Sequence, residues 1–131
     1  MSNKRMPADI KAIEESVTDY FESWFDGDVN RMRRCLHPRL AKRRPPKAGT
    51  EETDLWEVSY DEMIEDVSGG PKPQFDRQIA ISVLDVAGDI ATAKVLSAPF
   101  DEYVHLARIG GRWLIVNALY RRRPEVSSHV E

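Results

Sequence analysis

Residues 100–121, FDEYVHLARIGGRWLIVNALYR, decide which fold this sequence can adopt. Two runs rich in aliphatic and aromatic residues flank Gly110 and Gly111, and these two glycines accept the positive φ angles of a two-residue hairpin turn. The stretch therefore predicts a β-hairpin. Both faces of this hairpin are mainly apolar, so we expect helices to cover one face and a second sheet or a second subunit to cover the other.

The turn also sets which side chains share a face. If Ile109 lies opposite Arg112, one face carries Asp101, Tyr103, His105, Ala107, Leu114, Val116, Ala118 and Tyr120. The other face then carries Glu102, Val104, Leu106, Trp113, Ile115, Asn117 and Leu119. A β-bulge between Phe100 and His105 would exchange the two faces at that end of the hairpin.

The N-terminal part of the chain has the pattern of a bent pair of helices. Apolar residues at three- and four-residue steps predict a helix over about 7–26, which Gly27 ends as a C-cap. Asp28 is the expected N-cap of a short second helix, and His37 with Pro38 stops it.

The signals for regular structure are weak over 38–58, where we expect an irregular connection that acts as a mobile lid or wraps over a cavity mouth. Its basic segment, 39–47, is typical of solvated surface; the alternative is a docking site for an acidic partner. Ser59 and Glu62 have the spacing of a capping box, which predicts a third short helix closed by residues 68–71.

Alternating apolar residues predict two further strands, over 78–86 and 90–98, ahead of the hairpin. Helices followed by consecutive strands with short turns indicate an α+β domain with an antiparallel sheet. The 131 residues suit a single domain, for which we expect loose ends at about 1–6 and 122–131.

Composition narrows the class of protein and the kinds of site. A net charge of −3 with 31% charged residues predicts no general attraction to nucleic acid. No apolar run approaches the ~18 residues of a membrane span or forms a leader, so we expect no membrane association and a cytoplasmic location. Cys35 is the single cysteine and lies on an apolar helical face, which predicts an inert buried thiol. With three histidines and no metal-ligand spacing, we expect no metal and no cofactor.

Several polar residues of the hairpin are candidates for chemistry. Asp101, Tyr103 and His105 alternate, so they lie about 7 Å apart in successive steps on one strand face. A carboxylate, a phenol and an imidazole can transfer protons, but such groups are also ordinary in a subunit contact. On the other face, Glu102 and Asn117 are candidate polar groups of a small-molecule pocket, unless Glu102 points into water at the strand end.

Four aromatic residues, Tyr20, Trp24, Trp56 and Trp113, are candidate walls of such a pocket. The alternative is plain core, because an aromatic stripe at helical spacing is common inside proteins. His37, at the end of the second predicted helix, is the candidate for the pocket mouth.

Two groups of residues resemble those of a known family. The first group is YFESWFDGD over 20–28, Met32, LHP over 36–38 and LAKR over 40–43. The second group is VLDV over 83–86, IA at 90–91, AKV over 93–95 and GRWLIVN over 111–117. Over about 10–120 the chain thus resembles the putative lumazine-binding family of the nuclear transport factor 2-like, or cystatin-like, superfamily.

The resemblance implies a cone-shaped α+β fold. Three N-terminal helices would pack on a strongly curved antiparallel sheet of about four to six strands, with an internal cavity and a homodimer through the outer sheet face. The superfamily resembled includes ketosteroid isomerase and scytalone dehydratase as well as proteins that only bind or scaffold, so the fold alone assigns no reaction.

Two classes of function are compatible with these observations. The first is a homodimer whose cavity binds a small apolar or aromatic molecule, with walls from Tyr20, Trp24, Trp56, Trp113 and Asn117. Any reaction would be cofactor-free proton transfer or hydration, as in an isomerase, dehydratase or cyclase, with His105 or Glu102 as base and Tyr103 as donor. The alternative is a non-catalytic dimerisation or protein-interaction module, with a cavity under ~300 Å³ and Trp24 packed on Trp113.

Overall fold

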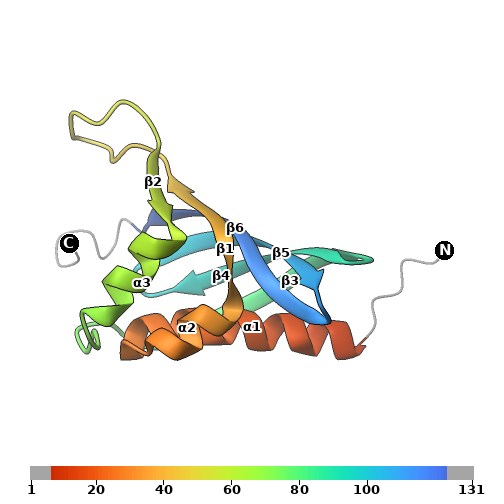
Figure 1. Ribbon diagram of the computed structural model, residues 1–131. Helices are drawn as coiled ribbons and strands as arrows, with labels where there is room; N and C mark the ends of the chain where they lie inside the picture. Colours follow the sequence, from red (N-terminus) through yellow and green to blue (C-terminus); the bar gives the residue numbers. More distant parts are fainter. Residues whose placement is uncertain (1–6, 124–131) are drawn as a thin grey trace.

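The structure, a computed structural model, describes residues 7–123 and packs three helices against one face of a six-stranded sheet (Figure 1). The helices are α1 (Pro7–Asp26), α2 (Val29–Cys35) and α3 (Tyr60–Ser68). The strands are β1 (Leu36–Arg44), β2 (Trp56–Ser59), β3 (Ile79–Ala87), β4 (Ile90–Ser97), β5 (Phe100–Ile109) and β6 (Arg112–Arg122). The predicted α+β class, with three helices on a curved sheet, is confirmed.

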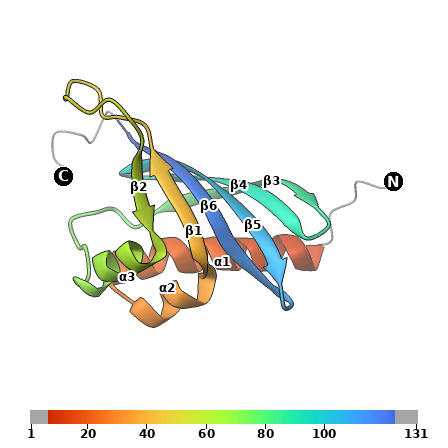
Figure 2. The ribbon, with the colours of Figure 1, turned by 45° about the horizontal axis from the view of Figure 1, so that its top comes forward.

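The sheet has the order β2-β1-β6-β5-β4-β3. Neighbouring strands are antiparallel, as expected, except β1 and β6, which run parallel. Figure 2 shows α1 running beneath the sheet, while α2 and α3 lie at the β1–β2 end. The opposite, outer face of the sheet is not covered by any described helix.

The local interactions that predicted the helix ends are present in the structure. Ile13, Val17 and Phe21, one turn apart on α1, are almost fully buried and face the sheet. Gly27 ends the helix with φ of 70°, a conformation that only glycine adopts easily. The Asp28 side chain then caps α2, and Ser59 forms the expected capping box at α3.

The predicted irregular connection over 38–58 is wrong at both of its ends. Residues 36–44 form β1 and residues 56–59 form β2, so only the loop 45–55 is irregular, and it projects away from the body (Figure 1). The interpretation of the basic segment as solvated surface is wrong for Lys42 and Arg44, each only 8% exposed. Their long aliphatic stems let them occupy inward positions of a strand, which hides the apolar alternation from sequence inspection.

The predicted hairpin forms, and Ile109 pairs with Arg112 around Gly110 and Gly111, which have φ of 59° and 78°. The predicted faces hold near the turn, where Leu106 pairs with Ile115.

Beyond that pair the predicted sorting of β6 is wrong. His105 pairs with Asn117, which leaves Val116 as an extra residue and forms a bulge. Asn117 and Leu119 therefore face outward with His105 and Tyr103. Ala118 and Tyr120 come onto the inner face, paired with Val104 and Glu102. The bulge lies on β6 and not between Phe100 and His105. The extra residue, Val116, allows both Ile115 and Ala118 to be buried.

The predicted loose ends fall mostly on residues 1–6 and 124–131, which lie outside the described residues. Arg122, placed in the loose tail by the sequence, instead belongs to β6 and pairs with Phe100. His129, one of the three histidines, also lies outside the described residues.

Candidate functional site

A cavity of about 610 Å³ lies between α3, the end of α1 and the inner face of the sheet. Its aromatic wall consists of Trp24, Trp56, Phe75, Phe100 and Tyr120. Charged side chains also reach the cavity, notably Lys42 from β1, Lys72 from the segment after α3 and Asp66 from α3 itself. The site is therefore built from helices α1 and α3, strands β1 and β2, the segment after α3, and the ends of strands β5 and β6.

The aromatic rings of the wall are fixed by contacts with one another. The Trp24 ring centroid lies 5.2 Å from that of Phe75 and 5.6 Å from that of Phe100. Phe100 in turn meets Tyr120 edge-to-face at 5.4 Å. The Trp24 Nε1–H donates to the Asp66 carboxylate at 3.0 Å, which orients the indole against α3. The wall is therefore a preformed aromatic surface.

Trp56 stands at the mouth of the cavity on edge strand β2 and is half exposed. The Arg44 guanidinium stacks 5.1 Å from its ring centre and also binds both oxygens of Glu52, at 2.9 and 3.2 Å. These bonds, with the Lys47 backbone N–H, hold the pKa of Glu52 down at about 2. Arg44 thus ties the loop 45–55 to the mouth.

Three polar side chains meet at the inner end of the cavity. The Tyr20 hydroxyl donates to Glu102 Oε2 at 2.5 Å, and the Lys42 ammonium donates to the Tyr20 oxygen at 2.6 Å. Lys42 Nζ lies 3.7 Å from Glu102 Oε2, an ion pair between side chains that are 10% and 1% exposed. Lys42, Trp24 and Phe100 also line a small hollow that reaches Tyr20 and Glu102. We call Tyr20, Lys42 and Glu102 the inner polar cluster.

Burial and charge shape the ionisation of these groups. Burial, followed by the nearby Glu102 carboxylate, raises the pKa of Tyr20 well above its ordinary value, so the phenol keeps its proton. Burial also raises the pKa of Tyr120. The pKa of Lys72 is lowered, chiefly by burial and further by Lys42, while Asp66 opposes the shift. Lys72 Nζ lies 4.0 Å from Asp66 Oδ1, so this carboxylate partly balances its charge.

The structure brings together only some of the residues that the sequence singled out. Tyr20, Trp24, Trp56 and Glu102 lie at the cavity or directly behind it. Trp113, expected as a wall, is buried elsewhere and donates to Asp9 at 3.3 Å.

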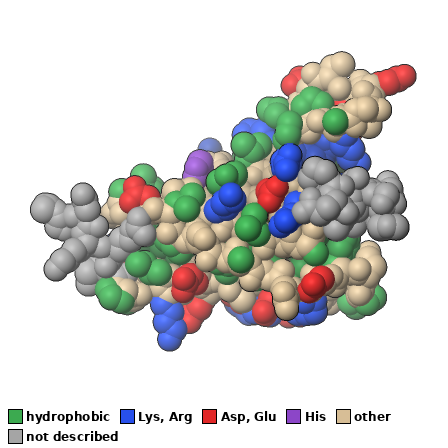
Figure 3. Space-filling view, turned by 180° about the vertical axis from the view of Figure 1, so that it is seen from behind, with side chains coloured by type: hydrophobic (Ala, Val, Ile, Leu, Met, Phe, Trp, Pro, Cys, Tyr) green, Lys and Arg blue, Asp and Glu red, His purple; other side chains and the backbone are tan. Residues whose placement is uncertain are grey.

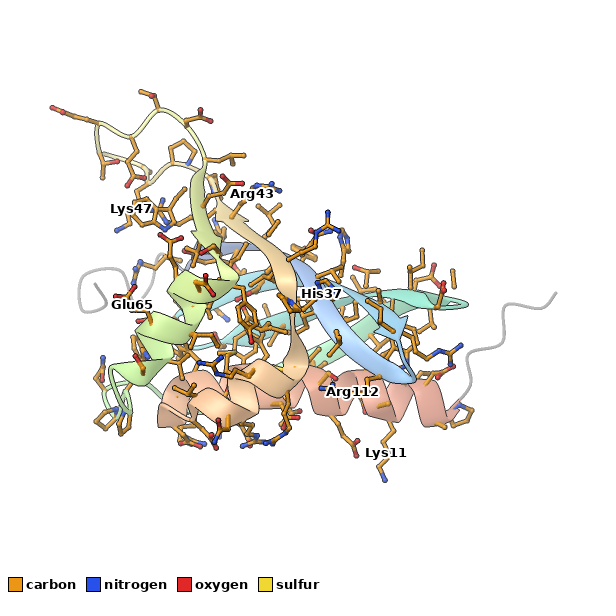
Figure 4. All side chains as sticks on the ribbon, viewed as in Figure 1. Lys11, His37, Arg43, Lys47, Glu65 and Arg112 are labelled. Carbon is orange, nitrogen blue, oxygen red and sulfur yellow. The ribbon has the colours of Figure 1, made fainter. Side chains whose placement is uncertain are left out.

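His37, expected near the mouth, lies at the start of β1, away from α3 and its Glu65 (Figure 4). Its Nδ1 accepts from the Arg39 backbone N–H at 3.0 Å. It is not among the residues that line the cavity.

The remaining candidates lie on the outer face of the sheet. Asp101, Tyr103 and His105 do share one face, as the alternation predicted, and Asn117 joins them because of the β6 bulge. His105 Nδ1 is 3.4 Å from Asn117 Nδ2, and Asp101 pairs with Arg121 at 3.0 Å. The face seen in Figure 3 mixes hydrophobic, basic and acidic side chains. These groups cannot touch a ligand held in the cavity.

The comparison with known proteins places the chain in a family. Residues 8–121 match the family described as "Putative lumazine-binding". The chain belongs to this family. A search of the curated proteins gives no match. No helix within residues 7–123 has the length and apolar character needed to cross a membrane.

Solved structures share the fold of this putative lumazine-binding family member. A nuclear transport factor 2-like protein of unknown function from Silicibacter pomeroyi is 25% identical, with a TM-score of 0.77, over 92% of this chain and 100% of that one. One from Methylobacillus flagellatus is 23% identical (TM-score 0.74; 94% and 98% covered). A ketosteroid isomerase-like protein from Erwinia carotovora atroseptica is 13% identical (TM-score 0.62; 89% and 98% covered).

The sequence did not predict Lys42 as a site residue of this family member. Lys42 lines the cavity and also belongs to the inner polar cluster. Its basic neighbours Arg43 and Lys47, which Figure 4 places toward the projecting loop, made the whole segment look like surface. The usable signal was the alternation of Leu40, Lys42 and Arg44, which share the buried face of β1.

Cys35 of α2 is 1% exposed, and its thiol donates to the Met32 carbonyl at 3.3 Å. Burial, with a smaller contribution from Asp19, raises the pKa of this thiol to about 12. The thiol is therefore protonated at neutral pH, as an inert buried cysteine should be.

This raised pKa predicts a loss of stability in alkali. The unfolded chain releases the Cys35 proton above pH 9, the ordinary pKa, whereas the folded chain holds it up to about pH 12. We expect the free energy of unfolding to fall by up to about 1.4 kcal/mol per pH unit over that window. Urea denaturation at pH 8 and pH 10 tests this. Cys35→Ala should lose less stability between the two pH values; an equal loss contradicts the prediction.

Proposed function

We propose that this protein binds a small organic molecule in the cavity between α3 and the sheet. The observation that carries the proposal is the cavity itself: its 610 Å³ falls within the ~300–1,000 Å³ range of ligand sites. Five of the fourteen residues that line it are aromatic and six are charged, so the cavity offers both apolar surface and polar groups that can orient a ligand.

The positions of two tryptophans weigh against a filled interaction module. A small cavity with Trp24 and Trp113 packed against each other would have favoured that alternative. Instead Trp24 packs on Phe75 and Phe100 at the cavity wall, and Trp113 contacts Asp9 and Arg108. The space between the helices and the sheet is therefore available to a ligand.

Within this proposal, any proton transfer to a bound ligand falls to Glu102. It is the one of the four candidate catalytic residues on the inner face, 1% exposed and hydrogen-bonded by Tyr20. Asp101, Tyr103 and His105 point to the outer face and are proposed only as surface groups. The proposed function is binding, and a reaction of the bound molecule would be a further property of the same cavity.

A homodimer through the outer sheet face is the second part of the proposal. The supporting observation is a set of large apolar side chains exposed on the outer face: Leu96, Tyr103, Ile109 and Leu119, which are 36–51% exposed. Exposed apolar groups on an uncovered sheet are favourable contacts for a second copy.

One experiment tests both parts: a native mass spectrum of the protein purified from its own host, followed by a denaturing spectrum. We expect a dimer that carries a discrete additional mass, which denaturation releases. Trp24→Ala, which removes the centre of the aromatic wall, should lose the added mass and keep the dimer, whereas Leu119→Lys should do the reverse. A monomer contradicts the dimer, and a bare wild-type protein that also binds no aromatic probe contradicts the cavity function.

A further inference from the structure

The proposed function leaves open how charge is arranged in the cavity: two lysine ammonium groups of its lining lie deep, whereas two of its carboxylates lie at the rim. The Lys42 and Lys72 side chains are 10% and 15% exposed. In contrast, Asp66 and Glu57, which line the same cavity, have side chains that are 53% and 64% exposed. A ligand that enters therefore meets carboxylates first and ammonium groups last.

The rim carboxylates are also already engaged. Asp66 accepts from Trp24 Nε1, Glu57 pairs with Arg43 at 2.7 Å, and Glu62 accepts from the Ser59 backbone N–H. Glu102, the one buried carboxylate within residues 7–123, pairs with Lys42. Each deep ammonium group thus has one carboxylate partner, since Asp66 Oδ1 lies 4.0 Å from Lys72 Nζ, and what the inner end offers a ligand is a buried N–H donor of Lys42.

Lys42 has hydrogen-bonding capacity left for a ligand. An ammonium group has three N–H donors. Within residues 7–123, the hydrogen bond that Lys42 donates to protein goes to Tyr20, and its Nζ also lies 4.7 Å from the centre of the Tyr120 ring. At least one donor of a side chain that is nine-tenths buried remains for a group in the cavity. Because burial removes water, such a donor favours a charged acceptor.

The wall beside Lys42 fits a flat ring. Trp24, Phe100 and Tyr120 are all within the same lining as Lys42, and their rings already contact one another edge-to-face. A planar aromatic molecule can continue this arrangement with its ring against the wall. Its polar substituent then points to the inner end.

We infer that the cavity selects a planar aromatic anion, such as an aromatic carboxylate, sulfonate or enolate, whose charged oxygen is received by Lys42 Nζ. This inference rests on the proposed function and names the substrate class of the same site. Lys72, over the Trp24 ring at 4.6 Å and 4.0 Å from Asp66, is a second ammonium group in the same lining. Glu102 and Tyr20 hold Lys42 in place from behind.

Two dyes of nearly the same shape test the inference. Anilinonaphthalene sulfonate carries an anionic group, and phenylnaphthylamine has the same rings without it. Fluorescence titration of the full-length protein gives both dissociation constants, and each dye must displace the other. We expect the wild-type protein to bind the sulfonate at least about tenfold more tightly, as one charged hydrogen bond suggests. The preference should weaken as salt is added.

The decisive variant is the double substitution Lys42→Met with Glu102→Gln, which removes both buried charges together and so keeps the interior neutral. It should lose the preference for the sulfonate and bind the neutral dye within about twofold of wild type. Lys94→Met is the matched control, because Lys94 lies on the outer face, 5.5 Å from the Tyr103 ring centre, and should change neither constant. Thermal melts confirm that each variant is folded.

Three results would overturn the inference. If both dissociation constants rise by the same factor in the double variant, Lys42 shapes the wall but does not select for charge. An unchanged sulfonate preference, or its loss in Lys94→Met, would place the anion elsewhere. In these cases the cavity function stands. If neither dye binds the wild-type protein, the cavity function fails together with the anion preference.

Discussion

Replacing Glu102 by alanine should lower the free energy of unfolding by about 3–5 kcal/mol, the usual cost of removing one partner of a buried ion pair. The alanine leaves the Lys42 ammonium without its buried countercharge and the Tyr20 hydroxyl without its acceptor, 2.5 Å away in the native protein. Tyr20 is 2% and Lys42 8% exposed, so water replaces the lost carboxylate only in part. Equilibrium denaturation in urea measures the loss.

Two matched variants separate the causes of this loss. Glu102→Gln keeps an acceptor for Tyr20 and removes only the charge, so it should cost less than alanine. Adding Lys42→Met to Glu102→Gln removes the uncompensated cation and should recover part of the stability, since buried pairs are often replaceable by neutral groups. If Glu102→Ala costs under about 1 kcal/mol, the range of exposed pairs, the inner polar cluster does not exist as described.

Replacing Gly27 by alanine should cost more than about 4 kcal/mol, which only a few kinds of substitution reach. Gly27 has φ of 70°, so any side chain adds strain of roughly 1–2 kcal/mol. A Cβ atom there would also lie 2.5 Å from the backbone carbonyl carbon of Gly70, which cannot move aside as a flexible side chain would. The C-terminal end of α1 and the segment after α3 would have to separate.

Gly111→Ala is the control for this prediction. Gly111 has φ of 78°, but nothing lies within 4 Å of the position of its Cβ, so only the strain of roughly 1–2 kcal/mol should appear. Equal losses at the two positions would contradict the close approach of Gly27 to Gly70. Because the Lys72 N–H donates to the Phe25 carbonyl at 2.8 Å in the same region, Gly27→Ala should also disturb the cavity wall.

Local signals were enough to predict most of the fold. The apolar steps of α1, the Gly27 break, the capping box of Ser59 and Glu62, and the Gly110–Gly111 turn each act within a few residues. Such interactions favour the same conformation whatever surrounds them, so the sequence reveals them directly. Part of the candidate site was predictable for the same reason, because Tyr20 and Trp24 lie one turn apart on a helix.

The sequence by itself therefore determined the helices, the central hairpin and the α+β class. The tertiary structure decided the rest. Strand β1 forms because β6 offers it a parallel partner far along the chain, and the Val116 bulge forms because Ile115 and Ala118 are both buried. The position of Lys42 depends on Tyr20 and Glu102. Tyr20 is 22 residues from Lys42 in the sequence, and Glu102 is 82 residues from Tyr20. Contacts between distant segments have no local pattern, so only the folded chain shows that this cavity ends in a buried cation.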